Sequence, residues 1–156
     1  MYLRHMKRPD PSLVAYIEAE IIPRYEHFDR AHGTDHVRTV IAQSLALAAR
    51  YVVDTDMVYP AAAYPDTGLA NGREHHHIDA GRLLAEDTEL RRRFTEEQIG
   101  IMREAVEDHR ASSDHPPRTI YGRIVAEAVR VIGPATYVRR TVQYGLANYP
   151  ALDREG

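Results

Sequence analysis

The sequence predicts an all-α protein, a single compact bundle of about six or seven helices. Apolar residues recur at helical spacing along almost the whole chain, and no sustained stretch alternates apolar and polar residues as a half-buried strand does. A length of 156 residues, 44% of them hydrophobic, suits one domain with one core. Because no internal repeat or long linker divides the chain, we treat residues 1–156 as one domain and expect residues 1–9 to be mobile.

Three helices are expected in the first half, over residues 11–22, 34–53 and 54–64. The first begins with Asp10 and Pro11, because aspartate is a favoured N-cap and proline is tolerated at the first helical position. Pro65 ends the third, since proline lacks an N–H and disfavours helical backbone in the residue before it. The ten residues that begin there, PDTGLANGRE, are expected to form a loop because they combine proline, glycine, asparagine and aspartate.

The second half is expected to hold helices over residues 75–87, 95–109, 119–132 and 135–146. A short turn is expected over residues 88–94. Thr95 and Gln98 have the spacing of a capping box, which predicts a helix start at that point. The segment RASSDHPPR, residues 110–118, is a second expected loop, and Gly133 with Pro134 is expected to separate the last two helices.

The composition excludes several classes of function. Twenty Lys and Arg against 23 Asp and Glu give a net charge of -3, which offers no general attraction to nucleic acid or to an anionic membrane. The chain has no cysteine, and Lys7 is its one lysine, so thiolate and Schiff-base chemistry are not expected. No segment has the length of an apolar membrane span or the pattern of a secretory signal. We expect a cytoplasmic protein whose partner is a small molecule, with the oligomeric state left open.

Most of the nine histidines are grouped in short clusters with aspartates. The grouped residues are His32, Asp35, His36, Asp66, His75, His76, His77 and Asp79, to which His109 and His115 can be added. Imidazole nitrogen and carboxylate oxygen are ligands of borderline divalent metals, and a hydrolytic site needs three or four of them with one open position. The alternative for any single histidine is a helix cap or a solvated side chain.

Three segments carry a resemblance to a known family: AHGTDHV, AAAYPDTGLANGREHHHIDAG and EAVEDHRASSDHPPRTIYGRIVAEAVRVI. They resemble a bacterial branch of the HD-domain superfamily, which consists of small all-α metal-dependent phosphohydrolases. The family motif is a histidine early in one helix, a His-Asp doublet at the end of the next, and an aspartate on a late helix. The resemblance implies that His36 is the first metal ligand and that Asp66 is the aspartate of the doublet.

The sequence departs from the family motif at two of its four ligand positions. Pro65 stands where the family has the histidine of the doublet, and Val129 stands where it has the second aspartate. Neither side chain has a lone pair to offer. His36 and Asp66 alone are expected to hold an ancestral divalent ion (Mn, Fe, Mg, Ni or Zn) weakly if at all, so no cofactor is expected. Related enzymes use additional histidines near this loop, which makes His75, His76 and His109 alternative donors.

Loss of two ligands inside an otherwise intact motif favours a scaffold whose metal site was removed by engineering, leaving an apolar pocket for a small organic molecule. In that interpretation His36 is the general base or nucleophile, Asp66 orients it, and His109 is a further catalytic candidate. The candidates for binding the substrate are Val129, Arg73, Glu74, His75 and Arg110. Two alternatives are a residual metal-dependent phosphoester hydrolase that uses the auxiliary histidines, and a ligand-binding protein without enzymatic activity.

Overall fold

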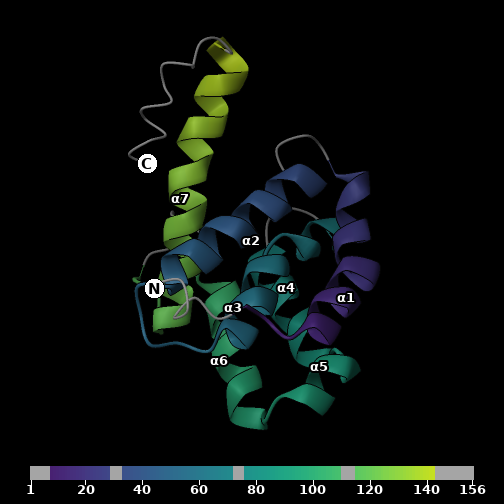
Figure 1. Ribbon diagram of the computed structural model, residues 1–156. Helices are drawn as coiled ribbons and strands as arrows, with labels where there is room; N and C mark the ends of the chain where they lie inside the picture. The colour runs from purple at the N-terminus through teal and green to yellow at the C-terminus, as the bar shows by residue number, and fades with distance from the viewer. Residues whose placement is uncertain (1–7, 29–32, 72–75, 110–114, 143–156) are drawn as a thin grey trace.

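The computed structural model describes residues 8–28, 33–71, 76–109 and 115–142, and within these ranges every regular element is helical (Figure 1). The all-α prediction is therefore confirmed. The elements are α1 (Pro11–Glu20), the 3-10 helix η2 (Ile22–His27), α2 (Thr34–Ala48), α3 (Thr55–Ala63), the 3-10 helix η4 (Thr67–Asn71), α4 (His76–Glu86), α5 (Thr88–Arg93), α6 (Glu96–Glu107) and α7 (Ile120–Val142). Most of the residues expected to be mobile, 1–7, lie outside the described part.

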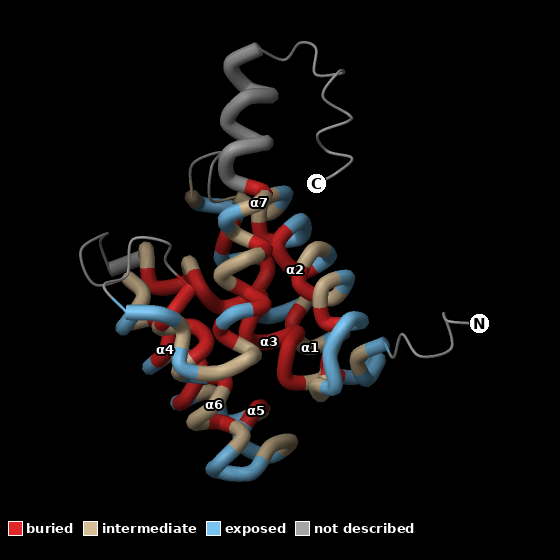
Figure 2. The backbone as a smooth tube through the Cα atoms, turned by 90° about the vertical axis from the view of Figure 1, so that its left-hand side faces the viewer, coloured by how far each residue is buried: buried red, intermediate tan, exposed pale blue. Residues whose placement is uncertain are grey.

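Helix α3 forms the centre of the bundle. Every one of its residues except Asp56 is buried, and α1, α2, α6 and α7 all pack against it (Figure 2). Its sequence TDMVYPAAA ends in three alanines, whose small side chains let neighbouring helices approach closely. The end of α3 and the turn that follows it are consequently held inside the bundle.

Several helix ends were predicted correctly because their signals are local. The Asp10 side chain accepts a hydrogen bond from the Ser12 backbone at the start of α1, and Asp54 caps α3 in the same way. Thr95 and Gln98 form the expected capping box at α6. In the described ranges no helix is both long enough and apolar enough to cross a membrane.

The predicted turn over residues 88–94 is wrong, since residues 88–93 form helix α5. The side chain of Asp87 accepts hydrogen bonds from the backbone N–H groups of Glu89 and Leu90, and this cap stabilises a helix that has only one buried side chain, Leu90. Part of the predicted loop over residues 65–74 is likewise helical, as η4.

The expected break at Gly133 and Pro134 is also wrong, because α7 continues through both residues. A proline inside a helix removes one backbone hydrogen bond and destabilises the helix, but it can kink the helix without ending it. Two other boundaries differ as well. Helix α2 ends at Ala48 rather than near residues 51–53, and residues 22–27 after α1 form η2.

Candidate metal centre

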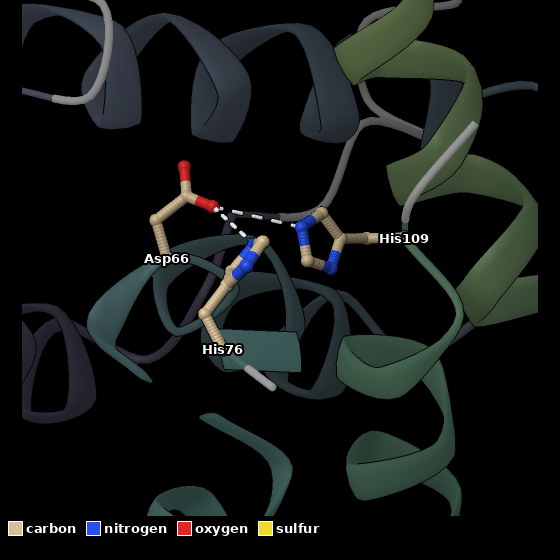
Figure 3. Close-up of side chains that lie close together, drawn as sticks. All are labelled: Asp66, His76 and His109. Carbon is tan, nitrogen blue, oxygen red and sulfur yellow. Dashed lines mark ion pairs between the residues drawn. The ribbon is translucent and has the colours of Figure 1, made fainter. Parts of the chain in front are cut away.

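The carboxylate of Asp66 lies among three histidine side chains. His76 Nε2 is 3.4 Å and His109 Nε2 is 3.6 Å from Asp66 Oδ1 (Figure 3). His36 Nε2 is 3.9 Å from the other oxygen, Oδ2. We call these four residues the Asp66 cluster.

Each member of the Asp66 cluster comes from the end of a different helix. Asp66 lies in the turn after α3, His36 in the first turn of α2, His76 at the first residue of α4, and His109 just beyond the end of α6. Helices α2 and α3 pack together, and so do α4 and α6, so four separate chain segments meet at this point. The position of each side chain is therefore determined by packed helices.

Gly68 permits the close approach that places His76 beside Asp66. A Cβ atom at Gly68 would lie 2.1 Å from the backbone oxygen of His76 and 2.8 Å from the backbone nitrogen of Ala80. Only glycine allows η4 to lie this close to the first turn of α4. The contact joins the segment after Asp66 to the helix that carries His76.

The backbone determines which nitrogen of His109 carries a proton. His109 Nδ1 lies 2.7 Å from the carbonyl oxygen of Val106, and because a carbonyl oxygen only accepts, Nδ1–H must be the donor. A neutral His109 then has its lone pair on Nε2, the atom that faces Asp66 Oδ1. A neutral imidazole with its lone pair on Nε2 is the form of histidine that binds a metal ion through that atom.

The distances in the Asp66 cluster suit a divalent metal ion. Ligand atoms bound at about 2.1 Å in a tetrahedral site lie about 3.4 Å apart. Ligand atoms of Asp66, His76 and His109 all lie within 4.8 Å of one another, and two of the separations are 3.4 and 3.6 Å. A mixed set of imidazole nitrogens and a carboxylate oxygen is also the donor chemistry that Zn, Ni and Fe accept.

The cluster is mostly enclosed by protein. The exposed fraction of the side chain is 6% for His109, 13% for Asp66, and 16% for both His36 and His76. A carboxylate in such surroundings is costly to keep charged without a cationic or hydrogen-bonding partner.

A second acidic residue near His109 is already paired. Asp108 is buried and accepts hydrogen bonds from the Arg118 backbone N–H at 2.9 Å, from Nε at 3.0 Å and from a terminal guanidinium nitrogen at 2.9 Å. Burial alone would raise the pKa of Asp108, but the hydrogen bonds and charge of Arg118 together hold it below its ordinary value. This ion pair ties the end of α6 to the start of α7 and thereby holds the chain next to His109.

The structure brings together the three residues that the sequence marked as catalytic, His36, Asp66 and His109. Val129 is partly buried and packs against the main core, and Pro65 is buried. The other sequence candidates for the site lie outside the described residues; these are Arg73, Glu74, His75 and Arg110, together with His32. The predicted apolar pocket stays a prediction.

His76 belongs to the cluster, although the sequence analysis gave it only as one of three alternative donors and preferred His75 for the substrate. A local signal does distinguish His76 within the run of histidines. Ala80 and Leu84 are buried on α4, and His76 precedes them at the same spacing of four residues, so all three share one face of the helix. Comparisons with protein-family models, with curated proteins and with solved structures find no match for this chain.

Proposed function

We propose that the chain binds a divalent metal ion in the Asp66 cluster and hydrolyses phosphoesters with it. The observation that carries the proposal is the pair of atoms His109 Nε2 and Asp66 Oδ1, 3.6 Å apart. The Val106 carbonyl directs the proton of His109 to the opposite side of the ring. Asp66, His76 and His109 would be the residues that hold the metal ion, through one carboxylate oxygen and two imidazole nitrogens.

The proposed ligand set replaces the donors that the family motif has lost. Pro65 and Val129 contribute none, whereas His76 and His109 add two imidazoles beside the retained aspartate. A set dominated by nitrogen favours Zn, Ni, Co or Fe(II) and disfavours Mg, which prefers oxygen ligands. We therefore expect the cluster to bind Zn, Ni, Co and Fe(II) more tightly than Mg.

The residues of the cluster have distinct roles in this proposal. A divalent ion at such a site acidifies water and withdraws electrons from a phosphoryl group. Asp66 supplies the anionic ligand, and the bond from His109 Nδ1–H to Val106 holds the ring of His109 in its binding orientation. His36 faces the other oxygen of Asp66, and we assign it the transfer of the proton from the attacking water.

The substrate class rests on the resemblance of the three quoted segments to HD-type phosphohydrolases. The enclosure of the cluster agrees with it, because removing water strengthens the interactions that stabilise developing charge on a phosphoryl group. The donor set of the cluster supports a metal-assisted hydrolysis, and the proposal includes both monoesters and diesters.

A second candidate function is the binding of a small organic molecule by a redesigned, metal-free scaffold. Its support is the apolar character of two positions, Pro65, which is buried, and Val129, which packs against the core. In this candidate, the three histidines of the Asp66 cluster interact with Asp66 through hydrogen bonds and ion pairs alone, without a metal ion. It therefore predicts that the protein carries no metal.

Metal content separates the two candidates. The purified chain, prepared without chelator, would be analysed by mass spectrometry and then titrated with Zn, Ni, Co, Mn and Mg while hydrolysis of p-nitrophenyl phosphate and bis(p-nitrophenyl) phosphate is followed. We expect about one equivalent of metal and an activity that chelator removes. Asp66→Ala should abolish both, and His36→Ala should lower kcat while metal stays bound.

The matched control for these variants is His27→Ala, because His27 is an exposed histidine outside the cluster. It should leave metal content and activity unchanged. A wild-type protein that neither contains metal nor binds any of the five ions would contradict the proposed function and favour the metal-free candidate.

A further inference from the structure

We propose that Tyr25 is the positioning residue of the metal site, because its hydroxyl holds the turn that carries Asp66. This inference rests on the proposed function, since it concerns the same ion. Tyr25 lies on η2, far from Asp66 in sequence, and its side chain is buried. It touches none of the reacting groups and acts through the backbone of the ligand.

The hydroxyl of Tyr25 makes two hydrogen bonds at the end of α3. It donates to the carbonyl oxygen of Ala63 at 2.7 Å and accepts from the backbone N–H of Asp66 at 3.3 Å. Ala63 is the last residue of α3, and Asp66 follows three residues later. One side chain from another segment therefore bridges the two ends of the turn that precedes the metal ligand.

The turn depends on this outside partner because its own backbone offers few bonds. Pro65 has no N–H. The backbone N–H of Thr67 bonds the carbonyl of Tyr64 at 2.9 Å, so it is not directed to Ala63. The last carbonyls of a helix lack partners within the helix and must find them elsewhere. The hydroxyl of Tyr25 is the partner of the Ala63 carbonyl. The same hydroxyl also accepts the hydrogen bond from the N–H of Asp66 and so fixes the position of that residue.

The surroundings of Tyr25 keep the hydroxyl in place and protonated. Its ring meets Phe28 edge to face, with ring centroids 5.5 Å apart. Burial, together with the negative charge of Asp66, raises the pKa of Tyr25 well above its ordinary value. The hydroxyl therefore remains a donor to Ala63 across the physiological pH range.

The test is Tyr25→Phe, which keeps the ring and removes only the hydroxyl. The matched control is Tyr16→Phe, which also removes a tyrosine hydroxyl but one that bonds Asp87, away from the cluster. Removing a group that orients a metal ligand weakens metal binding by about 10-fold to 100-fold. We expect a loss in this range for Tyr25→Phe and none for Tyr16→Phe, measured by titration with Zn in competition with a chromophoric chelator.

A spectroscopic measurement distinguishes positioning from a general loss of stability. The visible absorption of bound Co(II) reports the geometry of its ligands. It should change in Tyr25→Phe and stay the same in Tyr16→Phe, even where both variants lose similar stability toward urea. If the wild type binds no metal, the proposed function fails, and this inference fails with it. If the wild type binds metal and Tyr25→Phe has the same affinity and spectrum, only this inference is overturned.

Amide hydrogen exchange in the wild type provides a measurement that does not depend on the folding of a variant. The N–H of Asp66 donates to a buried hydroxyl, so it should exchange at least 100-fold more slowly than an exposed amide. Exchange of the Asp66 amide at the rate of an exposed amide would overturn the inference.

Discussion

Gly68 lies so close to the backbone of His76 that no side chain fits between them. The substitution Gly68→Ala would place a methyl group 2.1 Å from the His76 oxygen, so η4 and α4 must separate. We expect the free energy of unfolding to fall by about 1–3 kcal/mol. Because the same movement separates Asp66 from His76, metal affinity should fall at least tenfold. Urea denaturation and calorimetric titration with Zn check the two expectations.

Gly100 provides the control for this prediction. It lies within α6, and a Cβ atom there would meet nothing within 4 Å. Gly100→Ala should raise stability by about 0.5–1 kcal/mol, because alanine is the better helix former, and leave metal binding unchanged. Equal effects of the two substitutions would contradict the close contact at Gly68.

The ion pair of Asp108 and Arg118 predicts a dependence of stability on pH. Arg118→Met would remove the two hydrogen bonds that the guanidinium of Arg118 donates to the buried carboxylate of Asp108. The backbone bond can persist and the guanidinium is partly exposed, so we expect a loss of about 1–3 kcal/mol at pH 7. Substitution of the exposed Arg123 by methionine is the control and should change stability by less than about 0.5 kcal/mol.

The sign of the pH effect follows from the lowered pKa of Asp108. A carboxyl group with a lowered pKa in the folded state stabilises that state above its unfolded pKa, 3.8, and this contribution is lost as the pH falls through the folded pKa. The difference in unfolding free energy between the wild type and Arg118→Met should therefore shrink below about pH 4. A difference that stays constant from pH 7 to pH 2.5 would contradict the pairing.

Asp87 joins three helices, so we expect its substitution to have a large effect on stability. One oxygen accepts hydrogen bonds from the hydroxyls of Tyr16 and Tyr64, and the other caps α5. Asp87→Ala removes all of these bonds and should cost about 2–4 kcal/mol in urea denaturation. Asp87→Asn keeps an oxygen for the cap, so it should cost about half as much. Equal losses for the two substitutions would contradict the role of the cap.

Local signals in the sequence predicted the helix starts at Asp10 and Thr95, because a cap depends on residues within three positions. Helix α5 was missed for the opposite reason. Its sequence TELRRR has little apolar pattern, and the contacts of Asp87 that support it come from tyrosines 23 and 71 residues away. A sequence pattern confined to neighbouring residues cannot reveal contacts with residues so far along the chain.

Only part of the candidate site could be predicted, because its residues lie far apart in the sequence. The residues His36, Asp66 and His109 were chosen from a family resemblance, since nothing in the spacing of residues 36, 66 and 109 brings them together. The preference for His75 over His76 was a choice that the helical spacing of Ala80 and Leu84 could have corrected. Tyr25 had no signal at all, because its role depends on a backbone contact 41 residues away.

The last prediction concerns Pro65 and Val129, the two positions at which the sequence departs from the HD-domain motif that it resembles. The double substitution Pro65→His with Val129→Asp should strengthen metal binding at least tenfold over the present chain and raise hydrolysis of a generic phosphate ester. It should also shift the preference toward Mn, because aspartate adds an oxygen donor. Either single change should recover much less, since ligands that act on one ion have non-additive effects.

The double variant carries a cost that provides a second readout. Val129 is partly buried and packs against the core, so the new carboxylate lacks compensation whenever the metal is absent. The metal-free double variant should therefore be less stable than the present chain and should regain stability when Mn is added. The control is Pro65→His with Val129→Asn, whose neutral side chain has a similar size but cannot supply an anionic ligand. Calorimetric titration of Zn and Mn into the three proteins decides the matter. Equal binding of Mn by the double variant and its control would mean that position 129 does not face the ion, because a carboxylate that reaches a divalent cation binds it far more strongly than an amide does.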